Sequence, residues 1–255
     1  MKGDSVARRA LRRLVRWTGD EVIPAETTLH FNEAVNFERE VIFIAVPKTG
    51  TSSIRSQLSV SGPMLIPDPH LTILQVRDGL YAHFLKKKLG SNHHFPTRPN
   101  TVLSDGEIRD LAKETFRRFF KFASVRNPWA RVFSLYHRRE GIQTRQAMDF
   151  ETFCKGLHYA SDTCVHPARA VNQLDWMIDE KGSLAVDFVL RLEDFAAGLR
   201  QIDELTQGRL GLVEKHLNQN SKSASDSYRA AYTETTRAIV AEIFKRDIEF
   251  FGYEF

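Results

Sequence analysis

A lysine, a glycine and a series of hydroxyl side chains follow directly after an apolar run near residue 43. The stretch reads FIAVPKTGTSS over residues 43–53. Where a strand turns into a helix, the backbone N–H groups of the helix N-terminus converge and the helix dipole favours negative charge. Lys48 adds a cation, and Gly50 lets the backbone approach a ligand closely. The stretch therefore predicts a site for a phosphate-like anion, with hydroxyl donors from Thr49, Thr51, Ser52 and Ser53.

This order of residues differs from the Walker-type nucleotide loop. In that pattern, G-x-x-x-x-G-K-[ST], the lysine follows the glycine. Here Lys48 precedes Gly50, and no aspartate stands out as a magnesium partner. Taken alone, the stretch also fits a tight strand-to-helix turn with a solvent-exposed lysine.

A second stretch with the same character reads FASVRNPWARVFSLY. It places Arg126 at the end of another apolar run and Ser134 about two turns into the helix expected next. An arginine and a serine so placed can bind a second phosphate from one side. Taken alone, Arg126 is weak evidence, because an arginine at the end of a strand is usually a partner in a surface ion pair. Arg131 either supports this second site or makes a surface ion pair of its own.

The elements that must position these residues alternate between strands and helices. VIFIAV at residues 41–46 predicts a buried strand of a parallel sheet, because it is continuously apolar and rich in β-branched residues. Further strands are expected at 120–125 and 185–195. Helices are expected at 52–60, 70–90 with Gly79 as a candidate break, 103–119, from 128, over most of 150–180, and at 233–250. The pattern predicts one α/β domain whose mainly parallel sheet is flanked by helices.

Composition and cysteine usage narrow the class of protein. The 255 residues are 42% hydrophobic, which is enough for a core. No apolar run reaches the roughly 18 residues of a membrane span. Two cysteines, Cys154 and Cys164, are too few for a disulfide framework. We expect reduced thiols in a cytoplasmic protein, with a single disulfide as the open alternative.

The positive charge is concentrated at the N-terminus. The net charge is +4, but residues 1–16 alone carry +5, so the remaining chain is close to neutral. A nucleic-acid-binding domain would need a basic face on its folded body, and this distribution argues against one. Residues 1–30 are predicted to form a basic helical arm that precedes a domain at 31–255. The arm either packs as a solvated helix at one edge or contacts a membrane surface or a partner.

Together the two motifs resemble those of the sulfotransferase superfamily, and most closely the family-2, carbohydrate-type enzymes and their bacterial relatives. The first motif is similar to the 5′-phosphosulfate loop. The other is similar to the 3′-phosphate motif, whose arginine and serine lie eight positions apart, as Arg126 and Ser134 do. The resemblance runs from about residue 41 to the end of the sequence. Weaker similarity lies in VDFVLRLEDF, HLNQNS and IFKRDIEFFGY.

The resemblance implies a P-loop-type fold and the donor 3′-phosphoadenosine 5′-phosphosulfate, with a carbohydrate or glycolipid hydroxyl as acceptor. Lys48 would stabilise charge on the bridging oxygen of the leaving phosphate, and no metal is needed. Arg126 and Ser134 would hold the 3′-phosphate. The residues that would cradle the 5′-phosphosulfate are Lys48, Thr49, Gly50, Thr51, Ser52 and Ser53.

A general base must take the proton of the acceptor hydroxyl, and relatives use a histidine or a glutamate. His70 is the first candidate, because HLTILQVRDGL resembles a histidine-led helix of bacterial family members. Its alternative role is a helix cap or a surface side chain. The other candidates for the base are His93, His94 and Asp68.

Several other polar residues have weaker claims. Glu193 is expected to be structural, and Gln173 and Trp176 are candidates for the acceptor side, with core packing as the alternative for Trp176. A polar stretch resembles the loop that relatives fold over the nucleotide; its candidates are Lys215, His216, Asn218, Ser221 and Lys222.

Two rival functions stay open at the level of sequence. One is a P-loop nucleotide kinase that uses ATP and magnesium. The other is a non-catalytic module that binds a nucleotide or a membrane. The oligomeric state is not indicated by the sequence.

Overall fold

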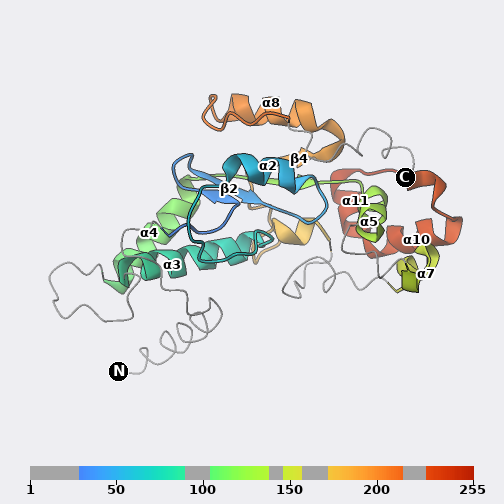
Figure 1. Cartoon of the computed structure of the whole chain (residues 1–255), viewed down its shortest axis with the longest axis horizontal. Coiled ribbons are helices and arrows are strands. Elements are labelled where there is room, and N and C mark those ends of the chain that lie inside the picture. The colour runs from blue at the N-terminus through green and yellow to red at the C-terminus, as the bar shows by residue number, and fades with distance from the viewer. Residues whose placement is uncertain (1–28, 90–103, 138–145, 157–171, 215–227) are drawn as a thin grey trace, which may run out of the picture.

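The computed structural model describes residues 29–89, 104–137, 146–156, 172–214 and 228–255 (Figure 1). The predicted basic arm lies outside these residues except for its last two positions, so its helix and its membrane contact stay predictions. None of the described helices is long and apolar enough to cross a membrane.

In chain order the elements discussed below are β1 (Val35–Asn36), β2 (Val41–Ile44), α2 (Thr51–Leu58), α3 (Ile73–Leu89), α4 (Asp105–Arg118), β3 (Phe120–Val125), α5 (Pro128–Tyr136), α7 (Phe150–Lys155), the 3₁₀ turn η2 (Leu174–Trp176), β4 (Phe188–Arg191), the 3₁₀ turn η3 (Leu192–Asp194), α8 (Phe195–Leu205), α10 (Glu234–Ile243) and α11 (Lys245–Phe251).

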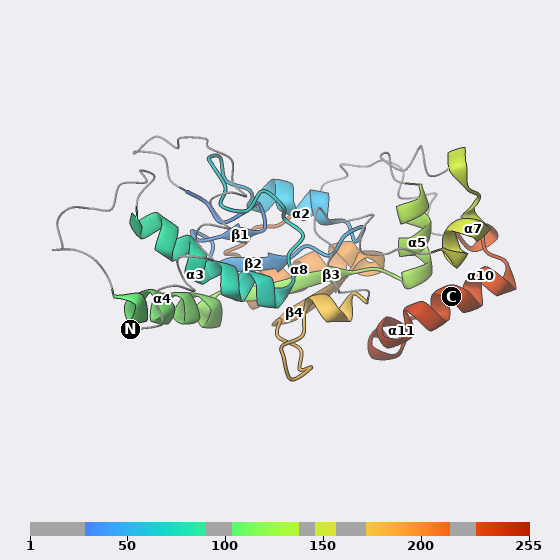
Figure 2. The ribbon, with the colours of Figure 1, turned by 90° about the horizontal axis from the view of Figure 1, so that it is seen from below.

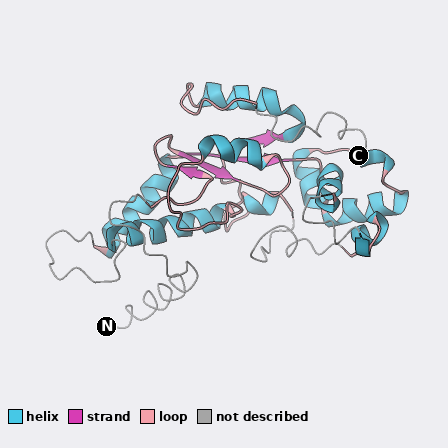
Figure 3. Cartoon of the chain, in the orientation of Figure 1, coloured by secondary structure: helices cyan, strands magenta, loops and turns pink. Residues whose placement is uncertain are grey.

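A four-stranded sheet in the order β1-β2-β3-β4 forms the centre of the domain. The short strand β1 is antiparallel to β2, whereas β2, β3 and β4 run parallel to one another. Figure 3 shows the strands, in magenta, between helices; α2 and α8 lie on one side, and α3 and α4 on the other (Figures 1 and 2). This arrangement confirms the predicted single α/β domain with a mainly parallel sheet flanked by helices.

The two faces of β2 belong to different cores. Ile42 and Ile44 pack into a cluster with side chains of α3 and α4, such as Leu80. Val41 and Phe43 pack into another with side chains of α2 and α8, such as Ile54. Because both faces are covered, the strand has no polar face, which explains the uninterrupted apolar run at residues 41–46.

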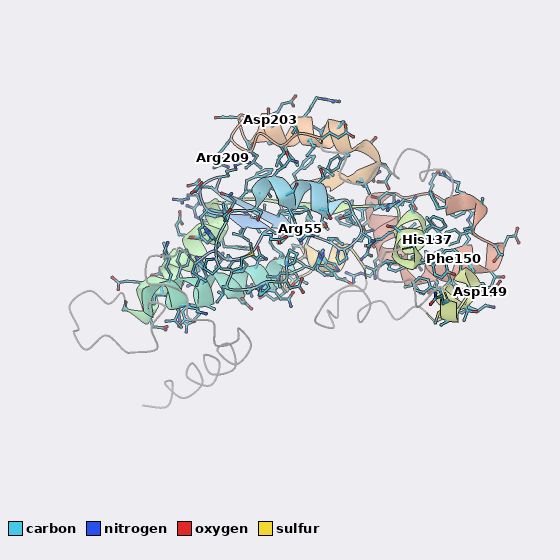
Figure 4. All side chains as sticks on the ribbon, viewed as in Figure 1. Arg55, His137, Asp149, Phe150, Asp203 and Arg209 are labelled. Atoms are coloured by element: carbon cyan, nitrogen blue, oxygen red, sulfur yellow. The ribbon has the colours of Figure 1, made fainter. Side chains whose placement is uncertain are left out.

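A third apolar cluster lies beyond the sheet and joins α5, α7 and α10, which gather at one end of the molecule (Figures 1 and 2). Figure 4 labels Phe150 at this end, at the start of α7. Cys154 is fully buried in the cluster as a free thiol, and burial raises its pKa to about 12. A thiol so protonated is a poor nucleophile, so Cys154 is a packing residue. Cys164 lies outside the described residues.

Local signals predicted the starts of α4 and α5 correctly. Ser104 and Glu107 form a capping box at α4, and the Asn127 side chain accepts hydrogen bonds at the start of α5, where Pro128 is the first helical residue. Gly79 does not break α3. A Cβ there would lie 2.8 Å from Cζ of Phe31, so the glycine makes room for a ring packed against the helix.

Two helix predictions hold only in part. Of the span 150–180, α7 is helical, residues 157–171 lie outside the described part, and within 172–180 the helical piece is η2, after which Ile178 bridges to Leu184. The helix expected at 233–250 is divided into α10 and α11 at Phe244, which is fully buried and has φ −106° and ψ 24°. Burial of this ring outweighs continuation of the helix.

A buried histidine in α3 predicts a pH-dependent loss of stability. The His83 ring is 2% exposed and stacks on Phe37 with 4.9 Å between ring centroids. Burial lowers its pKa to about 4, with smaller contributions from the charges of Lys87 and His30. In the unfolded chain its pKa is about 6.5. The unfolded state therefore binds the proton first as the pH falls, and the native state loses stability from about pH 6.5 down to about pH 4.

We expect His83 to reduce the free energy of unfolding by about 2 kcal/mol between pH 7 and pH 5. Urea unfolding at both pH values measures the loss, and His83→Phe isolates it, because that variant keeps an aromatic ring and cannot be protonated. An equal loss in His83→Phe and the wild-type protein would assign the acid sensitivity to other groups.

Candidate functional site

The two predicted anion loops follow adjacent parallel strands. Lys48 lies four positions after Ile44, the last residue of β2, and Arg126 follows Val125, the last residue of β3. Ile44 pairs with Ala123 in parallel register, so both loops leave the sheet at the same edge. Ligands of open α/β sheets bind at this carboxyl edge.

The loop after β2 has an unusual backbone. Lys48 has φ 71°, although it is not glycine, and Gly50 has φ 80° as the N-cap of α2. Left-handed residues in such a turn can direct successive N–H groups toward one side, as in known anion-binding turns. The φ of Gly50 strains any other residue, and a Cβ there would also lie 2.6 Å from Cδ1 of Leu192, which would have to shift. The first turn of α2 contains no acidic residue, so no carboxylate there offsets the positive end of the helix dipole.

The hydroxyl groups of this loop have different environments. The buried Thr49 hydroxyl donates to the Val46 carbonyl at 2.8 Å and lies 2.6 Å from the Ser124 hydroxyl, which then donates to it. The Thr49 side chain therefore anchors the loop to β3. A ligand in this loop would contact the backbone N–H of Thr49 rather than its hydroxyl. Thr51 is buried, Ser53 is half-buried and Ser52 is exposed.

Arg126 is held through its backbone, which leaves its guanidinium for other contacts. Its N–H donates to Oε1 of Gln173 at 2.9 Å, and its carbonyl accepts from Nε2 of Gln173 at 2.8 Å. Burial lowers the pKa of the Arg126 guanidinium, and the nearby Glu193 raises it. A poorly hydrated guanidinium gains more from an anionic partner than an exposed one does. Ser134 lies half-buried on α5, two turns after the loop.

Arg131 connects the two loops. It is 1% exposed, and its Nε donates to the Pro47 carbonyl at 3.0 Å. Its charge contributes to the lowered pKa of Arg126. The surface ion pair considered for Arg131 is therefore excluded, and the residue joins α5 to the turn that carries Lys48.

His70 lies against the end of β2. Its Nδ1 is 2.6 Å from the carbonyl of Ala45, and its backbone N–H donates to Asp68 at 2.8 Å. A carbonyl can only accept, so Nδ1 carries the proton and Nε2 carries the lone pair. Burial lowers the pKa of His70 and outweighs the Ala45 hydrogen bond; the charge of Arg55, labelled on α2 in Figure 4, lowers it further. The ring is therefore neutral at pH 7 and able to accept a proton at Nε2.

A further part of the site is residues 251–254, most of which lie in the stretch IFKRDIEFFGY, although their contacts with the two loops were not predicted. The Asn127 side chain donates to the Glu254 carbonyl at 2.7 Å, and Arg191 donates to the Phe251 carbonyl. Glu193 accepts from the Asn127 N–H at 2.7 Å, which agrees with its expected structural role. The segment 251–254 therefore ties the ends of β3 and β4 together.

The remaining candidates divide into buried residues and residues outside the described part. Trp176 is 1% exposed in the main core, as the packing alternative predicted, and Gln173 is fully buried rather than turned to the surface. Among the described residues no three His, Cys, Asp or Glu side chains gather as a candidate metal site. The candidates outside the described ranges are His93, His94, Lys215, His216, Asn218, Ser221 and Lys222.

Comparison with known proteins agrees with this geometry. Residues 34–254, which include both loops and all described strands, match the model of the sulfotransferase family. No curated protein and no solved structure gives a significant match. Enzymes of this family transfer sulfate, and the match covers most of the chain rather than one motif. The chain therefore belongs to the sulfotransferase family, in its family-2 type.

Proposed function

We propose that this enzyme transfers a sulfuryl group from 3′-phosphoadenosine 5′-phosphosulfate to a hydroxyl of a carbohydrate or glycolipid-like acceptor. The observation that carries the proposal is the common origin of the two loops at one edge of the sheet. Lys48 follows β2, Arg126 follows β3, and the buried Arg131 is hydrogen-bonded to the first loop and electrostatically coupled to Arg126. A donor with phosphates at both ends of one nucleoside needs two such sites.

The residues present fit this donor. The turn at Lys48–Gly50 offers backbone N–H groups, a cation and a helix N-terminus for the 5′-phosphosulfate, with Thr51, Ser52 and Ser53 in the first turn of α2. Arg126 and Ser134 would hold the 3′-phosphate. When bound, the donor supplies an activated sulfuryl group whose leaving group is already stable as a phosphate anion.

The residues of the chain then have three tasks. Lys48 neutralises the charge that grows on the bridging oxygen. His70 accepts the proton of the acceptor hydroxyl at Nε2, while its Nδ1–H stays bonded to the Ala45 carbonyl. The two loops align the reactants, which is the larger part of catalysis when the leaving group is already good.

Nucleotide binding tests the proposal directly. At 100 times its Kd, 3′,5′-bisphosphoadenosine should stabilise the protein by about 2.7 kcal/mol, which raises Tm by several degrees. ATP with magnesium serves as the comparison. A shift with ATP and magnesium alone would favour the nucleotide kinase. A shift with the bisphosphate but no sulfate transfer to a broad panel of sugar and glycolipid hydroxyls would favour a non-catalytic binding module.

A further inference from the structure

One buried side-chain amide satisfies both backbone groups of Arg126. Gln173 is 0% exposed; its Oε1 accepts from the Arg126 N–H at 2.9 Å, and its Nε2 donates to the Arg126 carbonyl at 2.8 Å. In an antiparallel sheet, a residue of the neighbouring strand normally accepts from the N–H and donates to the carbonyl of its partner in this way. Here β3 ends at Val125, and a side chain 47 positions away in sequence takes over that pairing.

A buried carboxylate holds Gln173 in turn. Asp247 in α11 is 0% exposed and accepts from the N–H groups of Gln173 and Leu174 at 2.8 and 2.9 Å. It also lies 3.2 Å from Nε2 of Gln173. The Gln173 nitrogen thus lies between two groups that only accept, and its oxygen faces an N–H. These partners define the amide orientation without ambiguity.

We infer that Gln173 is a positioning residue for Arg126 in recognition of the donor's 3′-phosphate, an inference that rests on the proposed function. Arg126 has a long side chain, and its direction is determined first by the orientation of its own peptide units. The next N–H, that of Asn127, is held in the same way by Glu193 at 2.7 Å. Side chains from two distant segments therefore fix the backbone of the loop at consecutive positions, where the sheet ladder has ended.

The experiment compares two nucleotides that differ only in the 3′-phosphate: 3′,5′-bisphosphoadenosine and adenosine 5′-phosphate. Calorimetry gives the Kd of each for the wild-type protein and for Gln173→Met, which has similar volume and makes neither hydrogen bond. The preference is the Kd for adenosine 5′-phosphate divided by the Kd for the bisphosphate. We expect this ratio to fall about tenfold in the variant, which is the effect of misplacing one charged hydrogen-bond partner. Its Kd for adenosine 5′-phosphate should change by less than about threefold.

Gln57→Met is the matched control. The Gln57 amide also pairs with one backbone in both directions, since it accepts from the Val213 N–H at 3.0 Å and donates to the Val213 carbonyl at 2.9 Å. Its loss should leave the preference ratio unchanged. Gln173→Glu is the second variant if Gln173→Met does not fold. Its carboxyl imitates the amide only when protonated, so the preference should recover as the pH is lowered.

The outcomes separate the two proposals. If the wild-type protein binds neither nucleotide, the proposed function fails. If the wild-type protein prefers the bisphosphate and Gln173→Met keeps that preference, the positioning role is overturned and the proposed function stands. The same holds if Gln173→Met raises the Kd of both nucleotides by the same factor. A selective loss in Gln173→Met, or a preference in Gln173→Glu that recovers at low pH relative to the wild-type protein, supports the role.

Discussion

Replacing His70 with asparagine is expected to lower kcat by about 10²–10⁴-fold, the usual contribution of a general base. The asparagine amide can still donate to the Ala45 carbonyl, which His70 contacts at 2.6 Å, so the anchor is kept and Nε2 is removed. The Kd of 3′,5′-bisphosphoadenosine should stay within about twofold, since His70 is proposed to serve the acceptor. Initial rates with an acceptor that the wild-type enzyme sulfates give kcat, and calorimetry gives the Kd of the bisphosphate.

The pH profile provides an independent test of the same role. Burial lowers the pKa of His70 below its ordinary value near 6.5. As the pH falls through that lowered pKa, Nε2 becomes protonated and can no longer accept a proton, so kcat/KM should fall on the acid side. His70→Asn should lack this acid limb. If the variant keeps near-normal turnover and the same limb, the base must be sought among Asp68, His93 and His94.

The second large effect is expected at Lys48. Lys48→Ala should lower kcat by about 10²–10³-fold, the range found when one stabilising donor is removed from a developing anion. Lys48→Gly should lose the same activity but be more stable than Lys48→Ala by about 1 kcal/mol, because glycine adopts the observed φ of 71° without strain. Steady-state rates and urea unfolding of both variants separate catalysis from folding.

Lys245→Ala is a suitable control for this pair. Lys245 is an exposed lysine in α11, 3.9 Å from Glu249, and an ion pair of this kind contributes little to stability. Its removal should change neither kcat nor the unfolding midpoint measurably. Turnover in Lys48→Gly close to the wild-type value would remove the ammonium group from the mechanism.

Features encoded by neighbouring residues could be predicted from the sequence. The strands at 41–46 and 120–125, the capping box at Ser104 and the Asn127–Pro128 helix start all depend on residues within a few positions of one another. The association of the Lys48 and Arg126 loops also follows from a simple rule, because adjacent parallel strands end at one edge.

Features that depend on distant residues could not be predicted. The Thr49 hydroxyl was expected to face a ligand, but Ser124, 75 positions away, is its partner. Gln173 was considered for the acceptor side, although its amide pairs with Arg126 across 47 positions. The division between α10 and α11 depends on burial of Phe244 rather than on local propensity. Single-sequence patterns carry no information about such pairings.

The contacts of residues 247–254 determine when the site can form during protein synthesis. Asp247 holds Gln173, and the Glu254 carbonyl holds Asn127, yet both lie about 200 residues after Lys48 along the chain. At about 5–20 residues per second, a ribosome needs about 10–40 s to cover that distance. A nascent chain that has already formed β2 and β3 therefore still lacks the groups that orient the second loop. The proposed donor site can therefore be completed only after residue 254 has been translated.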